Sequence, residues 1–391
     1  MDIHCRVNRP PSAAVIRVFF AAVLAVALMA AAAAPTARAA IPATTQPVPG
    51  KLLGVAGTSA ADIWAVGTTP ATTLPGRTLT EHWNGVGWRV VPSLSPGTGK
   101  GRDSVLSGVA AVTRTDVWAV GSYSSGPDAL NPTTFGLIEH WNGKRWTRVP
   151  CPCSHSLDGV PALAGIAAVS RSDIWAVGSG VGRPLIVHWN GKKWRRQFLP
   201  GNAENELTAV SATSARNAWA VGIDVANDHA LTAHWNGKTW SYVRNPNPAH
   251  FNVLRGVAAI SRTDAWAVGQ NSVKEVKIER WNGSMWSLVP DPHITGELLS
   301  VFNAITAAPH GGLWAVGKKT ISNGFQFDKT LTAHWTGTRW IAVPDPDLGS
   351  TDSILYGVYA SSKHSAWAVG FSRLDALIEH WNGKKWHLIT P

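Results

Sequence analysis

Residues Leu163 to Trp194 read LAGIAAVSRSDIWAVGSGVGRPLIVHWNGKKW, and near-copies of this stretch fill the chain from residue 52 onward. Each copy carries two markers, the sequence W-A-V-G and a pair of tryptophans five residues apart. The W-A-V-G marker begins at Trp64, Trp118, Trp175, Trp219, Trp266, Trp314 and Trp367. The pairs are Trp83/Trp88, Trp141/Trp146, Trp189/Trp194, Trp235/Trp240, Trp281/Trp286, Trp335/Trp340 and Trp381/Trp386. Seven copies with three tryptophans each account for all 21 in the chain, so no tryptophan is left for a special site.

Each copy predicts four short β-strands. In the copy above they are residues 163–169, 173–178, 185–189 and 194–198. Such runs, bounded by Gly, Pro, Asn, Asp or Ser and lacking a helical period, are typical of strands. Successive W-A-V-G markers lie 44 to 57 residues apart, a period typical of propeller blades. We therefore predict an all-β fold, a seven-bladed β-propeller of four-stranded antiparallel blades, with the small-residue first strand innermost.

The Asn-Gly sequence between the paired tryptophans predicts a hairpin. Six copies have it, and the remaining copy has Thr336-Gly337. Because Asn and Gly both tolerate positive φ, the dipeptide favours a two-residue turn. The two indoles would then share one face of the sheet. Burying each indole would contribute about 4–6 kcal/mol before entropy costs, so a neighbouring blade must cover them.

Residues 1–39 are predicted to be a secretory signal peptide, because three arginines precede the apolar run Val18–Ala34 and a small-residue cleavage pattern ends at Ala39. The alternative is an uncleaved membrane anchor, since the run approaches the length of a span. We expect a secreted, extracellular protein with residues 40–51 as a short N-terminal segment and 52–391 as the propeller. The predicted blades are residues 52–95, 105–152, 162–200, 206–248, 253–292, 298–346 and 354–391.

The W-A-V-G and H-W-N-G-x-x-W units resemble kelch repeats and the central propeller of galactose oxidase, and look closer still to secreted Trp-rich propellers of actinobacteria. The likeness covers residues 52–391 and departs at Val66-Gly67, where kelch repeats have Gly-Gly. The resemblance implies the fold and no particular chemistry, because one fold hosts many functions. Galactose oxidase chemistry is excluded, because both cysteines after residue 39 share one linker and the four tyrosines are scattered.

The two faces of the predicted ring differ in character. Turns between strands one and two, and between strands three and four, lie on one side, here called the basic face. Its candidate residues are Arg114, Arg171, Arg262, Lys144, Lys192 and Lys384. With the net charge of +11, this face could attach to an anionic cell envelope, or it could serve only solubility.

Connections between strands two and three, and between blades, form the opposite side, here called the variable face. They differ in length and carry many acids. Varied loops on a rigid scaffold are where recognition usually resides, so we predict a glycan or protein ligand there. The candidate loop residues are Phe135, Phe251, Phe325, Phe371, Asp128, Asp224 and Asp228.

Three other patterns could suggest chemistry. A ring of His82 and its five equivalents could bind metal, but Arg280 fills the seventh place, which favours a repeated packing position facing away from the tryptophan. The Asp of the S/T-R-x-D turns, such as Asp116, is interpreted as an acceptor of backbone N–H bonds. Cys151 and Cys153 could form a disulfide, bond to another chain or, with the nearby histidine, bind a metal.

The leading functional interpretation is an exported, non-catalytic binding or interaction module that acts through the variable face. No nucleophile elbow or phosphate-cradling glycine loop occurs, and neither a cofactor nor a metal is predicted. We expect a monomer without specific nucleic-acid binding and without a membrane span after residue 39. One alternative is a secreted polysaccharide hydrolase or lyase with its site at the axial mouth of the variable face. A second is electrostatic attachment to the anionic cell envelope.

Overall fold

The computed structural model describes residues 48–389 with short gaps, so the predicted signal peptide lies outside the described residues. The gaps are residues 71–75, 100–101, 128–131, 154–160, 181–182, 202–203, 249, 273–274, 295–296, 310, 323–324 and 347. Residues 43–391 form one compact unit, and every strand pairing lies within it.

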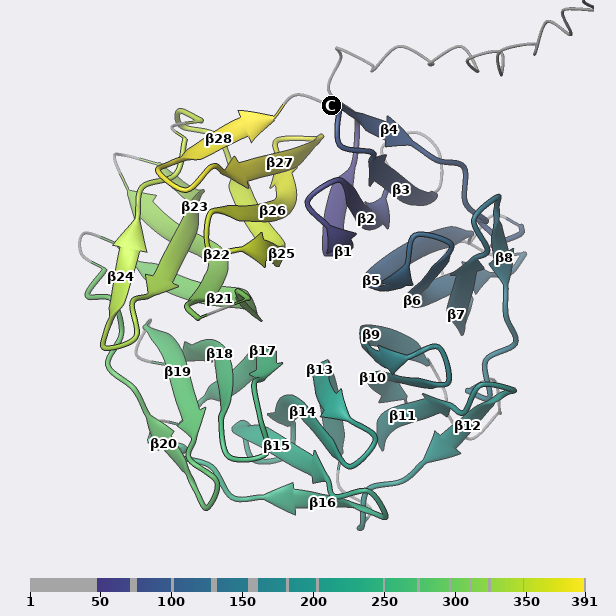
Figure 1. The fold of residues 1–391 in the computed structure, drawn as a ribbon, viewed down its shortest axis with the longest axis horizontal. Coiled ribbons are helices and arrows are strands. Elements are labelled where there is room, and N and C mark those ends of the chain that lie inside the picture. Colours follow the sequence, from purple (N-terminus) through teal and green to yellow (C-terminus); the bar gives the residue numbers. More distant parts are fainter. Residues whose placement is uncertain are drawn as a thin grey trace, which may run out of the picture. The chain divides into compact units, whose positions relative to one another are not determined.

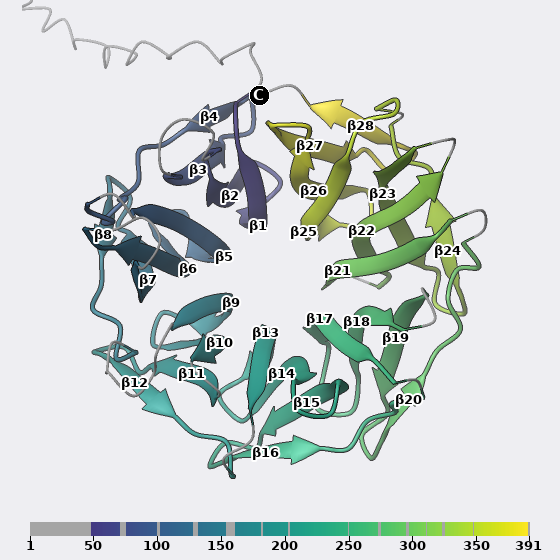
Figure 2. The same ribbon diagram turned by 180° about the vertical axis from the view of Figure 1, so that it is seen from behind.

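The compact unit is a ring of seven four-stranded antiparallel sheets (Figures 1 and 2). Blade one contains β1 (Lys51–Ser59), β2 (Asp62–Thr68), β3 (Thr78–Trp83) and β4 (Trp88–Val90). Blade two contains β5 (Asp103–Thr113), β6 (Asp116–Ser125), β7 (Thr133–Trp141) and β8 (Trp146–Arg148). Blade three contains β9 (Ala162–Ser170), β10 (Asp173–Gly180), β11 (Arg183–Trp189) and β12 (Trp194–Gln197). The predicted all-β, seven-bladed propeller is confirmed.

The other four blades follow the same order, each strand pairing with the next. Blade four contains β13 (Asn205–Ser214), β14 (Asn217–Asp224), β15 (His229–Trp235) and β16 (Trp240–Val243). Blade five contains β17 (Asn252–Ala259), β18 (Ala265–Asn271), β19 (Val276–Trp281) and β20 (Trp286–Leu288). Blade six contains β21 (Leu299–Ala307), β22 (Leu313–Ser322), β23 (Gln326–Trp335) and β24 (Trp340–Val343). Blade seven contains β25 (Ser353–Ser362), β26 (Ser365–Ser372), β27 (Asp375–Trp381) and β28 (Trp386–Ile389).

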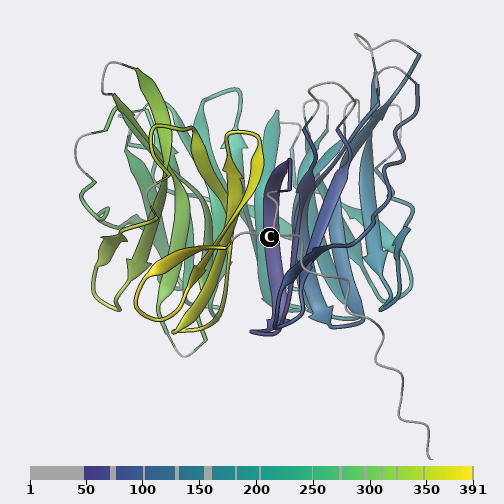
Figure 3. The ribbon, with the colours of Figure 1, turned by 90° about the horizontal axis from the view of Figure 1, so that it is seen from above.

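The first strand of each blade lies innermost, as predicted, and the strands run between the two faces of the ring (Figures 1 and 3). Small residues stand where neighbouring first strands approach each other. A Cβ atom added to Gly54 would lie 3.1 Å from the Cα atom of Gly108, and one added to Gly165 would lie 3.0 Å from the Cα atom of Ala209. Glycine or alanine at this repeat position therefore permits the close packing around the axis.

The tryptophans hold neighbouring blades together. The indole of Trp175 in blade three lies 5.0 Å from that of Trp235 and 5.3 Å from that of Trp240, both in blade four. The same three-ring contact recurs at every junction between blades. Because the paired indoles are direct cross-strand partners, each pair presents one surface to the preceding blade. The repeat thus encodes one inter-blade contact seven times.

The hairpin between the paired tryptophans differs from the two-residue turn predicted. Trp189 pairs directly with Trp194, so four residues form the connection. The side-chain oxygen of Asn190 accepts hydrogen bonds from the backbone N–H groups of Lys192 and Lys193, at 3.1 and 3.0 Å. Only the glycine, Gly191, has positive φ. The conserved role of the asparagine within the repeat is therefore to cap the turn with its side chain.

Residues 48–50 close the ring between blades one and seven. No strand from one end of the chain completes the blade at the other end, since β25 to β28 follow one another in sequence. The N–H of Gly50 donates to the carbonyl of Leu374, and the N–H of Ala376 donates to the carbonyl of Val48, both at 2.8 Å. Val48 also packs in the core cluster shared by the two blades. This short segment therefore bonds to the β26–β27 turn from the opposite end of the chain.

Removing this closing segment is expected to weaken the junction between blades one and seven. A chain that begins at Lys51 should unfold with a free energy about 2–4 kcal/mol lower than one that begins at Ala43, because it loses two hydrogen bonds and the burial of Val48. Denaturant unfolding of the two chains measures the difference. Equal stability would show that the segment does not close the ring.

Candidate functional site

Three of the cavities lined by described residues open on the variable face. The first, here called the blade 6–7 cavity, measures 340 Å³ and lies among β22, β23 and the linker from β24 to β25. The second, here called the rim cavity, measures 380 Å³ and adjoins the first, because Thr351 lines both. The third measures 310 Å³ and lies where the first strands of blades one and two begin. The first two are of the size of ligand pockets and form one continuous depression.

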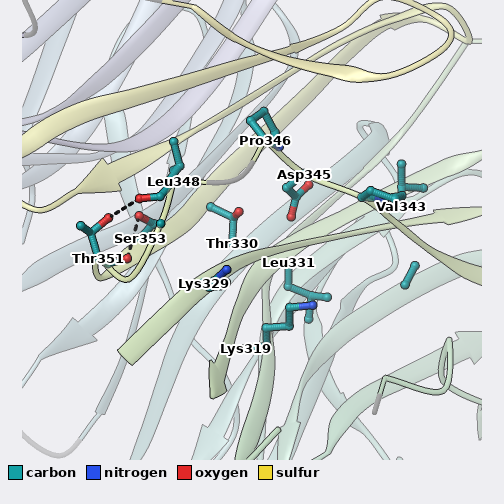
Figure 4. A pocket seen from close by; sticks show the side chains of 13 residues that line it. Lys319, Lys329, Thr330, Leu331, Val343, Asp345, Pro346, Leu348, Thr351 and Ser353 are labelled. Atoms are coloured by element: carbon teal, nitrogen blue, oxygen red, sulfur yellow. Dashed lines mark hydrogen bonds between the residues drawn. The ribbon is translucent and has the colours of Figure 1, made fainter. Parts of the chain in front are cut away.

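The blade 6–7 cavity combines an apolar wall with a few polar groups (Figure 4). Leu331, Val343 and Leu348 supply apolar side chains. The linker that forms its far wall is held by its own turn, in which the Thr351 hydroxyl donates to the carbonyl of Leu348 at 3.0 Å. A mostly apolar pocket with a small number of placed polar groups is typical of a recognition site.

Two lysines meet at one side of this cavity. Lys319 on β22 and Lys329 on β23 are direct cross-strand partners, and both line the cavity. Like charges placed directly opposite each other destabilise a sheet unless an anion lies near them. The carboxylate of Asp345, in the linker, supplies part of this compensation through its attraction to Lys319. The two amines make this side of the cavity positively charged, which suits an acidic group on a ligand.

Asp345 lies in the cavity wall beside a second, deeper carboxyl group, that of Glu379 on β27. Burial raises the pKa of Asp345 to about 7, while hydrogen bonds from Thr332 and Thr330 and the charge of Lys319 oppose the shift. Burial, and then the charge of Asp345, raise the pKa of Glu379 well above its usual value. Glu379 is fully buried, so only Asp345 of this pair can meet a ligand.

The rim cavity continues the depression toward the first strand of blade seven. Asp328, Asp352, Phe371 and Arg373 line it. Asp328 is held by Lys318, whose Nζ lies 2.7 Å from its carboxylate, and its N–H donates to the carboxylate of Asp352 at 2.9 Å. These contacts fix the acids as part of the wall.

A β-bulge interrupts the first strand of every blade at the same repeat position, near the variable face. The seven bulge residues are Leu53, Ser107, Ala164, Thr208, Arg255, Asn303 and Tyr356. The residue before each bulge is Leu or Phe, and the one after is Gly or Ala, but the bulge residue differs in all seven copies. Being partly or fully exposed on the innermost strand, these side chains surround the axial mouth. The residues that flank each bulge therefore repeat from blade to blade, whereas the bulge residues around the axial mouth do not.

The larger bulge side chains cluster on the side of blades five to seven. The Asn303 side chain donates to the carbonyl of Leu355 at 2.8 Å, which ties blade six to blade seven. Tyr356 stacks on Phe371, with ring centroids 6.1 Å apart, and the Lys51 amine lies 4.5 Å from the centroid of Phe371. Because Phe371 also lines the rim cavity, the axial mouth, the rim cavity and the blade 6–7 cavity form one surface.

The predicted aromatic loop residues occupy different kinds of position. Phe135 lies in β7 and stacks on Tyr123, and Phe371 lies in β26, so neither belongs to a loop. Phe251 is half-buried, and Phe325 is 84% exposed in the β22–β23 connection. The predicted loop position was wrong for Phe135 and Phe371, because the second and third strands extend past the repeat pattern and leave short connections.

The predicted acidic residues Asp224 and Asp228 line none of these three cavities. Asp224 ends β14 and accepts a hydrogen bond from Asn227, and Asp228 lies in the same turn with φ of 55°. Asp128 lies outside the described residues. Lys319, Lys329 and Asp345 were not among the predicted ligand-binding residues. The signal that could have found the lysines is their departure from the repeat, because no other blade carries a basic residue at both of these positions.

The basic face carries exposed cations in the turns of blades two to seven. They are Arg114, Lys144, Arg145, Arg171, Lys192, Lys193, Arg216, Lys238, Arg262, Arg339, Lys363, Lys384 and Lys385. All six predicted residues are among these thirteen. The exposure of the set shows that these charges take no part in the core.

The six histidines pack inside their own blades. The imidazole of His188 stacks on the W-A-V-G tryptophan Trp175, with ring centroids 4.0 Å apart, and its Nε2 lies 2.7 Å from the carboxylate of Asp173. The interpretation of this aspartate as an acceptor of backbone N–H bonds was therefore incomplete. In blade five Arg280 replaces the histidine and binds Asp264 at 3.0 Å. The expectation that the histidines face away from the tryptophan that follows them did not foresee this stacking on the W-A-V-G tryptophan of the neighbouring strand.

Cys151 and Cys153 form a disulfide in the linker after blade two, and Cys153 is fully buried. Among the described residues, no group of three or more His, Cys, Asp and Glu side chains is placed to hold a metal ion. The same part of the chain contains no helix long and apolar enough to cross a membrane.

Comparisons with known proteins support the fold and go no further. No family model matches the sequence, and no curated protein matches it. Among solved structures, YCF48 from Cyanidioschyzon merolae is similar at 14% identity and a TM-score of 0.52, covering 86% of this chain and 97% of that one. U3-55K is similar at 10% identity and a TM-score of 0.51, covering 82% and 88%. YCF48 bound to D1 peptide gives 14% identity and a TM-score of 0.47, covering 75% and 81%.

Proposed function

We propose that the protein is an exported interaction module that binds an extended segment of a partner protein on the variable face, over blades six and seven. The observation that supports this most strongly is the continuity of the blade 6–7 cavity with the rim cavity through Thr351. A depression of this form suits a chain that runs along it with one side chain placed in each cavity. Export rests on the sequence of residues 1–39.

The chemistry of the surface favours a protein segment over a glycan. Leu331, Val343 and Leu348 suit an apolar side chain, whereas a sugar would leave hydroxyl groups against them without partners. The Lys319–Lys329 pair suits an acidic side chain on the same segment. The partner segment is therefore expected to carry an apolar residue close to an Asp or Glu.

No catalytic step is proposed for this surface. The acidic pair that a polysaccharide hydrolase would need is not offered by Asp345 and Glu379, because Glu379 is fully buried between blades. A hydrolase or lyase at the axial mouth thus remains an alternative from the sequence without an observation that favours it. The kelch-like ancestry suggested by the repeats likewise stays a prediction.

Selection of random peptides displayed on phage, against the chain beginning at Ala43, tests the proposal. We expect saturable binders enriched in Asp or Glu next to an apolar residue. The variant K319A/K329A should bind them about tenfold or more weakly, because each lost charge contact is worth about 1–2 kcal/mol.

The matched control is K144A/K192A, which removes two exposed lysines from the basic face and should bind the same peptides with unchanged affinity. Equal weakening by both variants would contradict the proposal, because it would show a response to net charge alone. Selection of no saturable binder would contradict it as well.

A further inference from the structure

The basic face carries many exposed Lys and Arg side chains that take no part in the packing between blades. Both turns of blades two, three, four and seven carry exposed Lys or Arg, for example Lys144, Lys192 and Lys384. The backbone N–H groups of these three lysines donate to the asparagine that caps the turn. The turn is therefore held by backbone contacts and does not need a charged side chain at this position. Net charge close to a surface attracts an opposite charge over about 10 Å at moderate salt.

The carboxylates of these turns are mostly buried and contact side chains of their own blade. Among the described turn residues, Asp62, Asp116, Asp173 and Asp264 are the acids, and each lies 2.7 to 3.0 Å from a His or Arg nitrogen on the third strand. Between 1% and 28% of each side chain is exposed. The face that meets solvent is therefore dominated by positive charge.

Two turns of the same face break the basic pattern with apolar side chains. Val86 in blade one stands where other blades carry Lys144 or Lys192, and it is 87% exposed. Met285 in blade five stands where others carry Arg145 or Lys193, and it is 58% exposed. With this exposure, neither side chain belongs to the buried core. Apolar tips among cations are the combination by which proteins attach to anionic bilayers.

We propose that the basic face docks on an anionic lipid bilayer, with lysine and arginine side chains near the headgroups and Val86 and Met285 inserted among them. A soluble polyanion would satisfy the cations but would give the two apolar tips nothing to enter. The docked ring would present the variable face, on its opposite side, away from the membrane. This surface is separate from the one proposed to bind a partner protein, so either can fail alone.

Vesicle co-sedimentation of the chain beginning at Ala43 tests this inference, with vesicles of phosphatidylcholine alone and of three parts phosphatidylcholine to one part phosphatidylglycerol. We expect binding to the anionic vesicles only, and loss of that binding at high salt. The variant K144E/R145E/K192E/K193E should bind about a hundredfold more weakly, and V86N/M285N about five- to tenfold more weakly.

The matched control is R77E/R102E/R183E/R244E, which makes the same change in net charge with exposed residues at the variable-face ends of strands. It should bind within about threefold of the unchanged protein, because its charges face away from the bilayer. An equal loss of vesicle binding in both quadruple variants would overturn the inference. It would show that binding depends on the net charge of the protein and not on which face carries the charge. Unchanged binding by V86N/M285N, or binding to inorganic polyphosphate without binding to vesicles, would overturn the assignment of a bilayer. Thermal unfolding of each variant checks that the ring is intact.

Discussion

Replacing Trp219 by alanine is expected to lower the free energy of unfolding by about 3–5 kcal/mol, the cost of removing a large buried aromatic side chain. The indole is fully buried and lies 5.0 Å from both Trp281 and Trp286 of the next blade. It also contacts His234 in its own blade. Its loss leaves a void at an inter-blade contact that few other side chains can fill. Denaturant unfolding followed by tryptophan fluorescence measures the change.

The control for this substitution is Phe325→Ala, which removes an aromatic side chain that is 84% exposed. It should change the free energy of unfolding by no more than about 0.5 kcal/mol. If Trp219→Ala cost as little as the control, the three-indole contact would not be the main link between blades.

The stability of the protein is expected to fall as pH rises from about 5 to about 8. Glu81 and Glu139 are fully buried, and burial raises the pKa of each from 4.5 to about 7. Between these values the folded protein keeps two protons that the unfolded chain has released, so each added unit of pH favours unfolding. The loss amounts to about 3 kcal/mol per carboxyl group once the pH exceeds 7.

Glutamine at both positions tests this origin. The variant E81Q/E139Q should match the unchanged protein near pH 5 and exceed its stability by several kcal/mol, about twice the single-group effect, at pH 8. Glu206→Gln, at an exposed position, should leave the pH profile unchanged. A profile that rises with pH in the unchanged protein would refute the assignment of these two groups.

The sequence predicted the fold because the same packing problem is solved seven times. A tryptophan and a tryptophan pair at fixed spacing predict a sheet whose indoles need a neighbour, and Trp175 with Trp235 and Trp240 shows that contact. Small residues such as Gly54 predicted the innermost strand for the same reason, because only they fit near the axis. Repetition turns a weak local pattern into a strong one.

Side-chain partnerships were harder to predict. The spacing of Asp173 and His188 along the chain does not reveal that their side chains form a hydrogen bond between the adjacent strands β10 and β11. Likewise, Asn-Gly is compatible with several turns, and only the direct pairing of Trp189 with Trp194 shows a four-residue connection. The departure from the repeat at Lys319 and Lys329 was not used to predict a site, and the cavity itself depends on the linker that covers it.

The two faces differ in how much their sequence varies between blades, which suggests that they have different functions. Copies are nearly identical where blades pack, and they diverge at the axial bulges such as Arg255 and Tyr356 and in the walls of the blade 6–7 cavity. The basic face keeps Lys or Arg in at least one turn of each of blades two to seven, and only blade one, with Val86, has none. A uniform charged face suits a uniform surface, whereas a diversified face suits one particular partner.

Amide hydrogen exchange of the protein, with and without a peptide selected by display, tests the central claim most directly. We expect slower exchange on peptide binding in residues 328–331, 342–346 and 348–354, which line the blade 6–7 and rim cavities. Exchange in the basic-face hairpins around Lys144 and Lys192 should stay the same. Protection confined to those hairpins, with residues 328–331, 342–346 and 348–354 unaffected, would contradict the proposed binding site.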